Sequence, residues 1–394
     1  MKILHIIASV DPTGGGPIEG ILRQSDALPP EICRSIATFD DPSAPFLHDY
    51  PIEVHACGPV WGPKWRINLV NKYGFAPRFV PWLRAHVGLY DAVIVNGLWN
   101  YATFAAARVL IGGKVPYFVF THGMMDPWFK TSYPLKHAFK QAFWWFNEGP
   151  LLRGAKAVLF TCEEERLLAR NVFRGHQSYV EKVVGYGTLE PPPETSRQHM
   201  AFRAMVPQLS ARPFLLFLSR IHEKKGCDIL VEAFARHVTT APDLDLVIVG
   251  PDHAGLKQKL QNRAAALGVG HRIHWTGMLQ GDAKWGAFRG AEAFILPSHQ
   301  ENFGVVVAEA MACGKPVLTT DKVNIWREIE SSGGGLIETD TIEGIDRLLN
   351  RWLSLNEQER DEMRRRARLG FEMHFKMERA AMNIIALIDQ YIHD

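Results

Sequence analysis

The sequence predicts an α/β protein built from two doubly wound, Rossmann-like domains. Short apolar runs alternate with amphipathic segments along the whole 394-residue chain, which is the pattern of βαβ units and parallel sheets. A chain of this length exceeds one ordinary core, so two domains are expected. A segment with three consecutive prolines, "GYGTLEPPPETSRQ" at residues 185–198, separates two halves that both show the alternation. Prolines continue neither a helix nor a central strand, so the hinge is placed there.

The strands are expected at the apolar runs. In the first half these are "KILHIIAS", "YDAVIVNG", "YFVFTHG" and "AKAVLFT". In the second half they are "FLLFLSR", "LDLVIVG", "RIHWTG", "EAFILPS", "PVLTT" and a last signal near 337. Helices are expected between them, for example at 228–236, 256–267 and 304–312. We predict domains at 1–187 and 188–375 that face each other across a cleft, where sheets of this kind bind ligands at the carboxyl ends of their strands.

The composition restricts the class of partner and the compartment. The 44 Lys and Arg residues nearly balance the 42 Asp and Glu residues, which argues against a nucleic-acid binder. The five cysteines are dispersed and fit free thiols in a reducing compartment. The N-terminus reads as a first strand rather than a signal peptide, and no apolar run approaches the length of a membrane span. We therefore expect a cytoplasmic protein.

A glycine-rich turn follows the first strand, in "PTGGGPIEG". Its backbone N–H groups and the positive end of the next helix would form an anion or sugar site at Gly14, Gly15 and Gly16. The spacing fits neither a dinucleotide fingerprint nor a P-loop. A tight strand-to-helix turn that needs glycine for its backbone angles is the alternative.

Basic residues follow the first strand of the second half, in "FLSRIHEKKG". The guanidinium of Arg220 and the ammonium of Lys225 on one loop suit a diphosphate. A solvated basic loop is the alternative.

Two carboxylates flank a helix start in "SHQENFGVVVAEAMACGKPVLTT", residues 298–320. The N-terminus of this helix, at 303–305, would attract phosphate. Glu301 lies ahead of it and Glu309 lies within the helix, so each would reach the group on one side of a diphosphate. Carboxylates accept hydrogen bonds from vicinal hydroxyls, and a nucleotide sugar is the ligand that fits. Two surface glutamates on an ordinary helix are the alternative.

These motifs resemble a known family. "HQENFGVVVAEAMACGKPV" is similar to the E-x7-E signature of the family-4 retaining glycosyltransferases, which have the GT-B fold. "SRIHEKKG" is similar to their Arg-x4-Lys-Gly loop, and "GGGP" to their N-terminal glycine loop. The three motifs occur in the family's order and span most of the chain. Ser219, Asn302 and the hinge "VGYGTLEP" depart from the family pattern.

The resemblance implies roles for particular residues. Arg220 and Lys225 would hold the pyrophosphate, Glu301 the donor-sugar hydroxyls and Glu309 the ribose. His122, in "FTHGMMDPW", matches a His-Gly that lines the cleft opposite the donor, although a strand-end or core histidine is the alternative. The remaining donor-binding residues would be Asn302, Phe303, Gly304, Val305, Gly277 and Met278, the last two beside the base. The C-terminal helix, 376–394, would cross back to the first, acceptor-side domain.

The implied activity is retaining transfer of a hexosyl group from a UDP- or GDP-linked sugar to a glycan or lipid-linked acceptor, in bacterial surface polysaccharide or glycolipid synthesis. Double displacement would need a carboxylate nucleophile, and the first half offers no convincing one, with Asp126 and Glu19 the nearest by motif. The resemblance implies front-face substitution instead. No cofactor and no metal are expected, and the only Asp-x-Asp, 243–245, is interpreted as a solvated turn. A GT-B sugar-nucleotide epimerase and a non-catalytic sugar-nucleotide-binding relative are the alternatives.

Two stretches mix aromatic and basic residues, and seven of the eleven tryptophans lie in the first 150 residues. Residues 61–84 and 128–146 both suit an anionic membrane surface, which would place the protein peripherally on the inner face of the cell membrane. We expect 61–84 to be the contact. The alternative for 138–146 is that Phe139, Phe143 and Phe146 pack into the core of the first domain.

Overall fold

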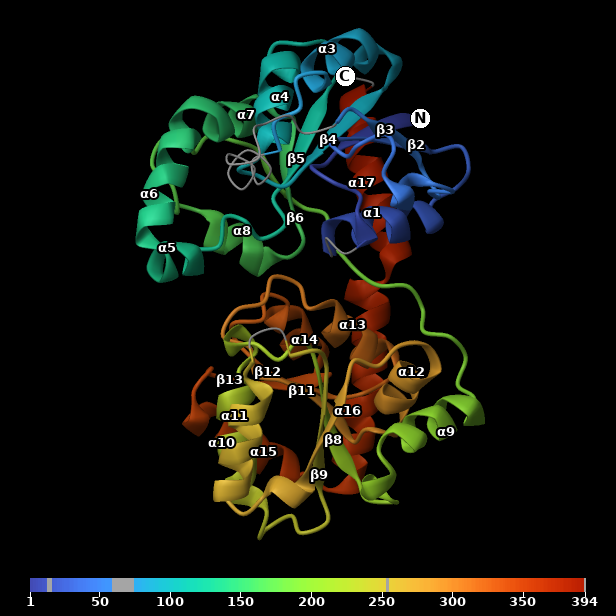
Figure 1. The fold of residues 1–394 in the computed structure, drawn as a ribbon, viewed down its shortest axis with the longest axis vertical. Helices are drawn as coiled ribbons and strands as arrows, with labels where there is room; N and C mark the ends of the chain where they lie inside the picture. Colours follow the sequence, from blue (N-terminus) through green and yellow to red (C-terminus); the bar gives the residue numbers. More distant parts are fainter. Residues whose placement is uncertain (13–15, 59–73, 253–254, 393–394) are drawn as a thin grey trace. The chain divides into compact units, whose positions relative to one another are not determined.

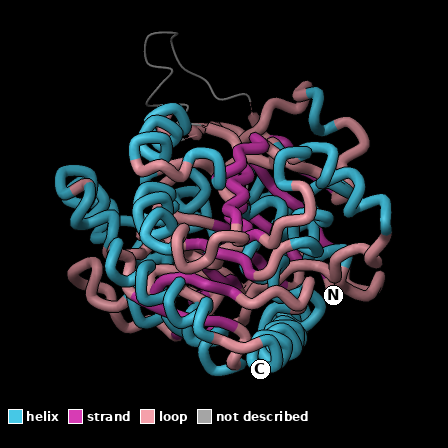
Figure 2. The backbone as a smooth tube through the Cα atoms, turned by 90° about the horizontal axis from the view of Figure 1, so that it is seen from below, coloured by secondary structure: helices cyan, strands magenta, loops and turns pink. Residues whose placement is uncertain are grey.

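The computed structural model describes residues 1–12, 16–58, 74–252 and 255–392. It confirms the predicted class, because the chain forms two α/β units, each with a parallel sheet flanked by helices (Figure 1). One unit comprises Met1–Tyr186 and Met377–Asp394, and the other comprises Gly187–Lys376. Helices lie outside and strands inside (Figure 2).

The first unit contains a seven-stranded sheet in the order β3-β2-β1-β4-β5-β6-β7, with all neighbours parallel. Its strands are β1 (Lys2–Ile6), β2 (Cys33–Thr38), β3 (Glu53–Ala56), β4 (Ala92–Asn96), β5 (Tyr117–Phe120), β6 (Ala157–Phe160) and β7 (Glu181–Val183). Its helices are α1 (Gly16–Asp26), α3 (Phe79–His86), α4 (Tyr101–Leu110), α5 (Trp128–Ser132), α6 (Pro134–Phe143), α7 (Gly149–Gly154), α8 (Glu163–Ala169) and α17 (Met377–Ile392), with a π-helical turn at Trp144–Glu148.

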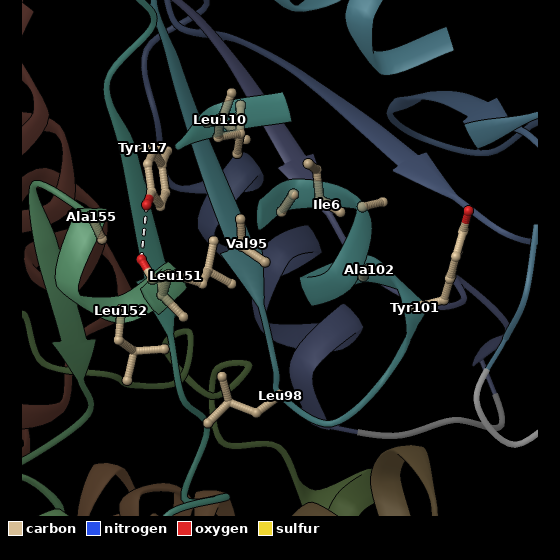
Figure 3. Close-up of a cluster of buried hydrophobic side chains, with 14 of the residues drawn as sticks. Ile6, Val95, Leu98, Tyr101, Ala102, Leu110, Tyr117, Leu151, Leu152 and Ala155 are labelled. Carbon is tan, nitrogen blue, oxygen red and sulfur yellow. Dashed lines mark hydrogen bonds between the residues drawn. The ribbon is translucent and has the colours of Figure 1, made fainter. Parts of the chain in front are cut away.

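The core of this unit lies between the sheet and the helices α4 and α7. Val95 of β4, Ala102 of α4 and Leu151 of α7 are among its buried members (Figure 3). The buried hydroxyl of Tyr117 donates a hydrogen bond to the carbonyl of Leu151 at 2.8 Å, so its polar atom is satisfied within the core.

The C-terminal helix belongs to the first unit, where α17 lies beside α1 (Figure 1). Asn383 of α17 donates to the carbonyl of Val184 at 3.1 Å. Tyr186, the last residue before the chain enters the second unit, packs on Gly20, where a Cβ would lie 1.9 Å from its hydroxyl. These contacts fix both crossing segments to the first unit.

The second unit contains a six-stranded parallel sheet in the order β10-β9-β8-β11-β12-β13. Its strands are β8 (Phe214–Leu218), β9 (Asp245–Val249), β10 (Ile273–Gly277), β11 (Ala293–Leu296), β12 (Val317–Thr320) and β13 (Gly335–Glu338). Its helices are α9 (Ser196–Met205), α10 (Cys227–His237), α11 (Lys257–Ala266), α12 (Gly281–Gly290), α13 (Val305–Ala312), α14 (Trp326–Ser332), α15 (Ile342–Ser354) and α16 (Glu357–Gly370). The strand order reverses between β8 and β11, where open α/β sheets bind ligands.

The structure overturns one alternative for α6. Helical spacing allows Phe139, Phe143 and Phe146 to pack into the core, but they are 73%, 47% and 85% exposed. No residue of α6 is buried. Phe139 and Phe143 lie on α6 and Phe146 lies in the π-helical turn that follows. The spacing therefore predicts helical structure correctly, but the apolar stripe points to solvent.

Candidate functional site

The predicted diphosphate loop and the predicted glutamate loop meet at the edge of the second sheet. The loop that carries Arg220 and Lys225 follows β8, and the loop that carries Glu301 follows β11. These strands are parallel neighbours at the point where the strand order reverses. Because parallel strands end at the same edge, both loops lie where ligands bind in such folds.

Backbone contacts hold the two loops together. The amide of His299 donates to the carbonyl of Lys224 at 2.8 Å, and Lys224 Nζ donates to Gln300 Oε1 at 3.4 Å. Gly226 has a φ of +64°, and a Cβ there would lie 2.0 Å from the carbonyl oxygen of Pro297. Only glycine permits that approach, so the sequence Lys-Gly places the lysine against the second loop.

Lys225 forms a hydrogen-bonded ion pair with Glu301. Lys225 is buried, so the alternative of a solvated basic loop does not hold for this residue. The backbone of Glu301 is fixed as well, since its amide donates to the carbonyl of Lys322 at 2.9 Å and its carbonyl accepts from the amide of Asn324 at 3.0 Å. The pair presents a cation for an oxyanion beside a carboxylate that accepts hydroxyl hydrogens.

Glu309 has a comparable partner, which no motif in the sequence indicates. Its side chain is only 3% exposed within α13, and Lys284 Nζ of α12 lies 2.7 Å from its carboxylate. The ammonium of Lys284 also lies 4.9 Å from the ring centroid of Trp285. Each of the two predicted glutamates is therefore held by one lysine.

A cavity of about 410 Å³ is lined by Lys284, the partner of Glu309. It lies beyond the carboxyl ends of β8, β9 and β10 and combines two cations, Arg220 and Lys284, with the apolar side chains of Met278 and Trp285. Gly277 ends β10 with a φ of +73° and accepts a hydrogen bond from the amide of Gly250 at 2.8 Å. A mostly apolar pocket with a few polar groups is typical of a small-molecule site.

The helix start that the sequence predicts is present. α13 begins at Val305, and Gly304 precedes it with a φ of +71°. The first amides of a helix have no partner within it, which gives this end a partial positive charge. Phe303 is buried and packs edge-on against Phe375 at 5.7 Å, while Asn302 Oδ1 accepts from Asn324 Nδ2 at 3.4 Å.

In the first unit, His122 follows β5 in a constrained position. Its φ is +49°, its ring stacks on Phe120 at 4.3 Å, and its Nε2 donates to Asn96 Oδ1 at 3.1 Å. Asn96 Nδ2 in turn faces His5 Nδ1 at 3.3 Å. Burial lowers the pKa of His122 to about 4, and burial, with Arg34 nearby, lowers the pKa of His5. Both rings are therefore neutral at pH 7.

A buried carboxylate that the sequence did not single out holds the loop of His122. Glu165 of α8 accepts hydrogen bonds from the amide of Gly123 at 2.6 Å and from the hydroxyl of Thr121 at 2.8 Å. Its other oxygen accepts from the amide of Thr161 at 2.7 Å. Glu165 thus holds the side chain of Thr121 and the backbone of Gly123, the two neighbours of His122 in the chain.

The other acidic residues singled out in the first half have structural partners. Glu19 pairs with Arg23, and Asp126 Oδ1 accepts from the amide of Trp128 at the start of α5 at 2.8 Å. Gly16 begins α1 and its carbonyl accepts from the hydroxyl of Tyr186 at 3.2 Å. Gly14 and Gly15 lie outside the described residues.

The interpretation of residues 243–245 as a solvated turn is wrong for Asp245. This carboxylate is 2% exposed at the start of β9, and it accepts from Arg272 at 2.6 Å, His274 at 2.8 Å and Arg212 at 3.0 Å. Three cationic or polar donors stabilise the buried charge, so Asp245 is a structural anchor for β9 and β10.

Known proteins resemble both units. A family model described as "Glycosyl transferase 4-like domain" matches residues 31–184, and one described as "Glycosyl transferases group 1" matches residues 203–370. The D-inositol 3-phosphate glycosyltransferase of Geodermatophilus obscurus is 32% identical over 139 residues, which are 34% of this chain and 30% of that protein. The lipopolysaccharide core biosynthesis mannosyltransferase LpsB of Rhizobium meliloti is 30% identical over 141 residues, 35% and 39% of the two chains. These matches span less than two fifths of either relative.

Solved structures match over the whole length. HepE of Anabaena, in complex with UDP and glucose, has a TM-score of 0.73 and 19% identity, and the match covers 99% of this chain and 100% of HepE. Sucrose-phosphate synthase of Thermosynechococcus elongatus has a TM-score of 0.75 and 19% identity, over 100% and 99% of the two chains. At this identity the likeness shows a common fold.

Proposed function

Because this chain belongs to the family-4-like glycosyltransferases and has the GT-B fold, we propose that it is a retaining glycosyltransferase with a nucleotide-sugar donor. It moves a hexosyl group from a UDP- or GDP-linked sugar to a glycan or lipid-linked acceptor. Anabaena HepE, which shares the fold, has been solved with UDP-glucose, which supports a nucleotide-sugar donor. The name of LpsB, a mannosyltransferase of lipopolysaccharide core synthesis, supports a role in surface polysaccharide or glycolipid synthesis.

The observation that carries this proposal is the pairing of both glutamates with lysines, one of which, Lys284, lines the cavity together with Arg220. Arg220 and Lys225 bind the donor diphosphate, and Lys225 leaves Glu301 to do so. Glu301 then accepts hydrogen bonds from the donor sugar, and Glu309 from the ribose. The base occupies the cavity beside Met278.

The reaction is a front-face substitution. The bond between the anomeric carbon and the diphosphate oxygen breaks while the acceptor oxygen bonds to the same face of that carbon, and the departing phosphate takes the acceptor's proton. Negative charge grows on the diphosphate, where Arg220, Lys225 and the start of α13 stabilise it. His122 is neutral at pH 7. It therefore serves as a hydrogen-bond partner for a hydroxyl group and does not act through a positive charge. The carboxylates of Glu19 and Asp126 are engaged elsewhere, which supports a mechanism without a covalent sugar intermediate.

The test is a panel of UDP- and GDP-hexoses incubated with the purified protein and a membrane glycolipid extract. We expect one donor to yield nucleoside diphosphate and a glycoside with the donor's anomeric configuration, read by NMR. An inverted product would contradict retention. Nucleotide release without any acceptor, with an altered free sugar, would instead support an epimerase, and binding without turnover would support a non-catalytic relative.

A further inference from the structure

An apolar stripe on α6 faces solvent. Leu135, Phe139, Phe143 and Phe146 are 80%, 73%, 47% and 85% exposed. The first three lie on α6 at intervals of four residues, which keeps them on one side of the helix, and Phe146 follows in the π-helical turn at Trp144–Glu148. We call these four side chains the α6 face. Trp145, 48% exposed, lies next to it in the chain.

The opposite side of the segment is anchored to the first unit. The ring of His137 stacks on Phe173 at 4.7 Å. Gln141 Nε2 donates to the carbonyl of Arg174 at 3.0 Å, and the indole of Trp145 donates to the same carbonyl at 2.9 Å. The orientation of α6 is therefore fixed by its polar side, and the α6 face is turned outward by these contacts. Figure 1 shows α6 at the margin of its unit.

The charges of the segment that carries the α6 face have one sign. Between Asp126 and Glu148 the sequence contains three lysines and no acidic residue. Lys130 and Lys136 are exposed, while Asp126 and Glu148 at the two ends are buried. Aromatic rings flanked by lysines, without carboxylates, match the boundary between anionic headgroups and acyl chains. A protein partner would be expected to pair such lysines with its own carboxylates, but it would not require so many aromatic rings at one exposed helix.

We propose that the α6 face binds an anionic lipid bilayer, lying in the plane of its surface. The aromatic and leucine side chains enter the headgroup–acyl boundary while Lys130 and Lys136 contact lipid phosphates. No helix in the described ranges has the length and apolar character needed to cross a bilayer, so this would be attachment at one surface. The inference stands on the α6 face alone and does not depend on the proposed transferase activity.

This surface differs from the contact that the sequence favours. Of residues 61–84, only 74–84 are described, and in that part Phe79 and Leu83 of α3 are fully buried. These two residues pack in the core of the first unit. Residues 61–73 lie outside the described residues, so the favoured contact at 61–84 stays a prediction there.

The test is sedimentation of the full chain with sucrose-loaded vesicles. One set contains one-third phosphatidylglycerol in phosphatidylcholine, and the other phosphatidylcholine alone. We expect binding to the anionic vesicles at low salt and at least tenfold weaker binding at 0.5 M NaCl or without phosphatidylglycerol. The double variant Phe139→Ser/Phe146→Ser and the double variant Lys130→Gln/Lys136→Gln should each weaken binding at least tenfold.

Matched controls are available on the same unit. Leu89 is 65% exposed and Lys114 is exposed, so Leu89→Ser and Lys114→Gln should bind like the wild type. All variants change exposed side chains and should keep their circular dichroism and melting temperature.

Absence of wild-type binding, or equal binding by the α6 variants, would overturn the proposal. The proposal would also be overturned if light scattering showed that the wild type is a dimer and that Phe139→Ser/Phe146→Ser is a monomer. The α6 face would then join two copies of the chain. Turnover with a water-soluble acceptor, measured separately, reports on the proposed function and not on this surface.

Discussion

Lys284 Nζ lies 2.7 Å from the carboxylate of Glu309, on a neighbouring helix of the second unit. The two residues are 25 positions apart in the chain. A buried carboxylate is costly unless it is paired, and Lys284 supplies that pairing for Glu309. Because the pair holds the carboxylate in place to accept hydrogen bonds from ribose hydroxyls, the lysine is a positioning residue for the proposed donor site.

Replacement of this lysine should weaken donor binding. Lys284→Met leaves Glu309 buried without its ammonium partner, and we expect the donor KM to rise at least tenfold with a smaller change in kcat. Breaking such a pair should also cost stability, about 3 kcal/mol. The double variant Lys284→Met/Glu309→Gln should recover much of that stability but not the donor affinity. Lys259→Met, at an exposed lysine of α11, is the control, and an unchanged donor KM in Lys284→Met would refute the role.

The two glutamates should differ in their kinetic defects. Glu301→Gln should mainly lower kcat, because its contact with the transferred sugar matters most in the transition state. Glu309→Gln should mainly raise the donor KM, because a ribose contact is largely uniform binding. Steady-state kinetics with the donor varied will separate the two effects. Identical defects in both variants would contradict the assignment of one glutamate to each side of the diphosphate.

Activity should not require a divalent metal. The only Asp-x-Asp of the chain contains Asp245, whose carboxylate is already engaged by Arg272, Arg212 and His274. The proposed leaving group is neutralised by protein cations instead. Turnover should therefore be unchanged, within twofold, after dialysis against EDTA. Loss of turnover in EDTA with recovery in Mn²⁺ would show that this prediction is wrong.

Acid should destabilise the first unit through His122. Burial lowers its pKa from 6.5 to about 4, so the unfolded chain binds a proton more readily than the folded chain between these values. The stability that the neutral ring provides is present above pH 6.5 and is lost as the pH falls toward 4.

Urea unfolding of the wild type and of His122→Asn at pH 7, 6 and 5 tests this pH dependence. Asparagine is the replacement because it tolerates the positive φ at this position. The free energy of unfolding of the wild type should fall more steeply with acid than that of the variant. His5, whose pKa is also lowered and which His122 influences, remains in both proteins. Parallel pH profiles would contradict the assignment to His122.

Much of the fold could be predicted because its strands are long apolar runs. All six strands of the second sheet coincide with predicted runs. In the first sheet, β2, β3 and β7 were missed. Their sequences, "CRSIAT", "EVHA" and "EKV", contain polar, charged or small residues, since strands near a sheet edge need less apolar surface. Periodicity alone does not distinguish them from loops.

The site was predictable where one loop carries the chemistry and not where two distant elements meet. Short motifs predict four of the site residues, namely Arg220, Lys225, Glu301 and Glu309. Lys284 was missed because its partner lies on another helix, and a single lysine in α12 has no local signal. The orientation of α6 could not be read either, because a 3.6-residue period shows that one face is apolar but not what covers it.

Turnover by Lys225→Ala tests the central claim most directly. The measurement is the rate of nucleoside diphosphate release with the preferred donor and a membrane glycolipid extract, for the wild type, Lys225→Ala and Lys224→Ala. Lys224 lies on the same loop and contacts Gln300 rather than Glu301, so its variant should retain activity within threefold. Lys225→Ala should lose at least 100-fold in rate with its circular dichroism unchanged. A Lys225→Ala rate within threefold of the wild type would contradict the account of this site.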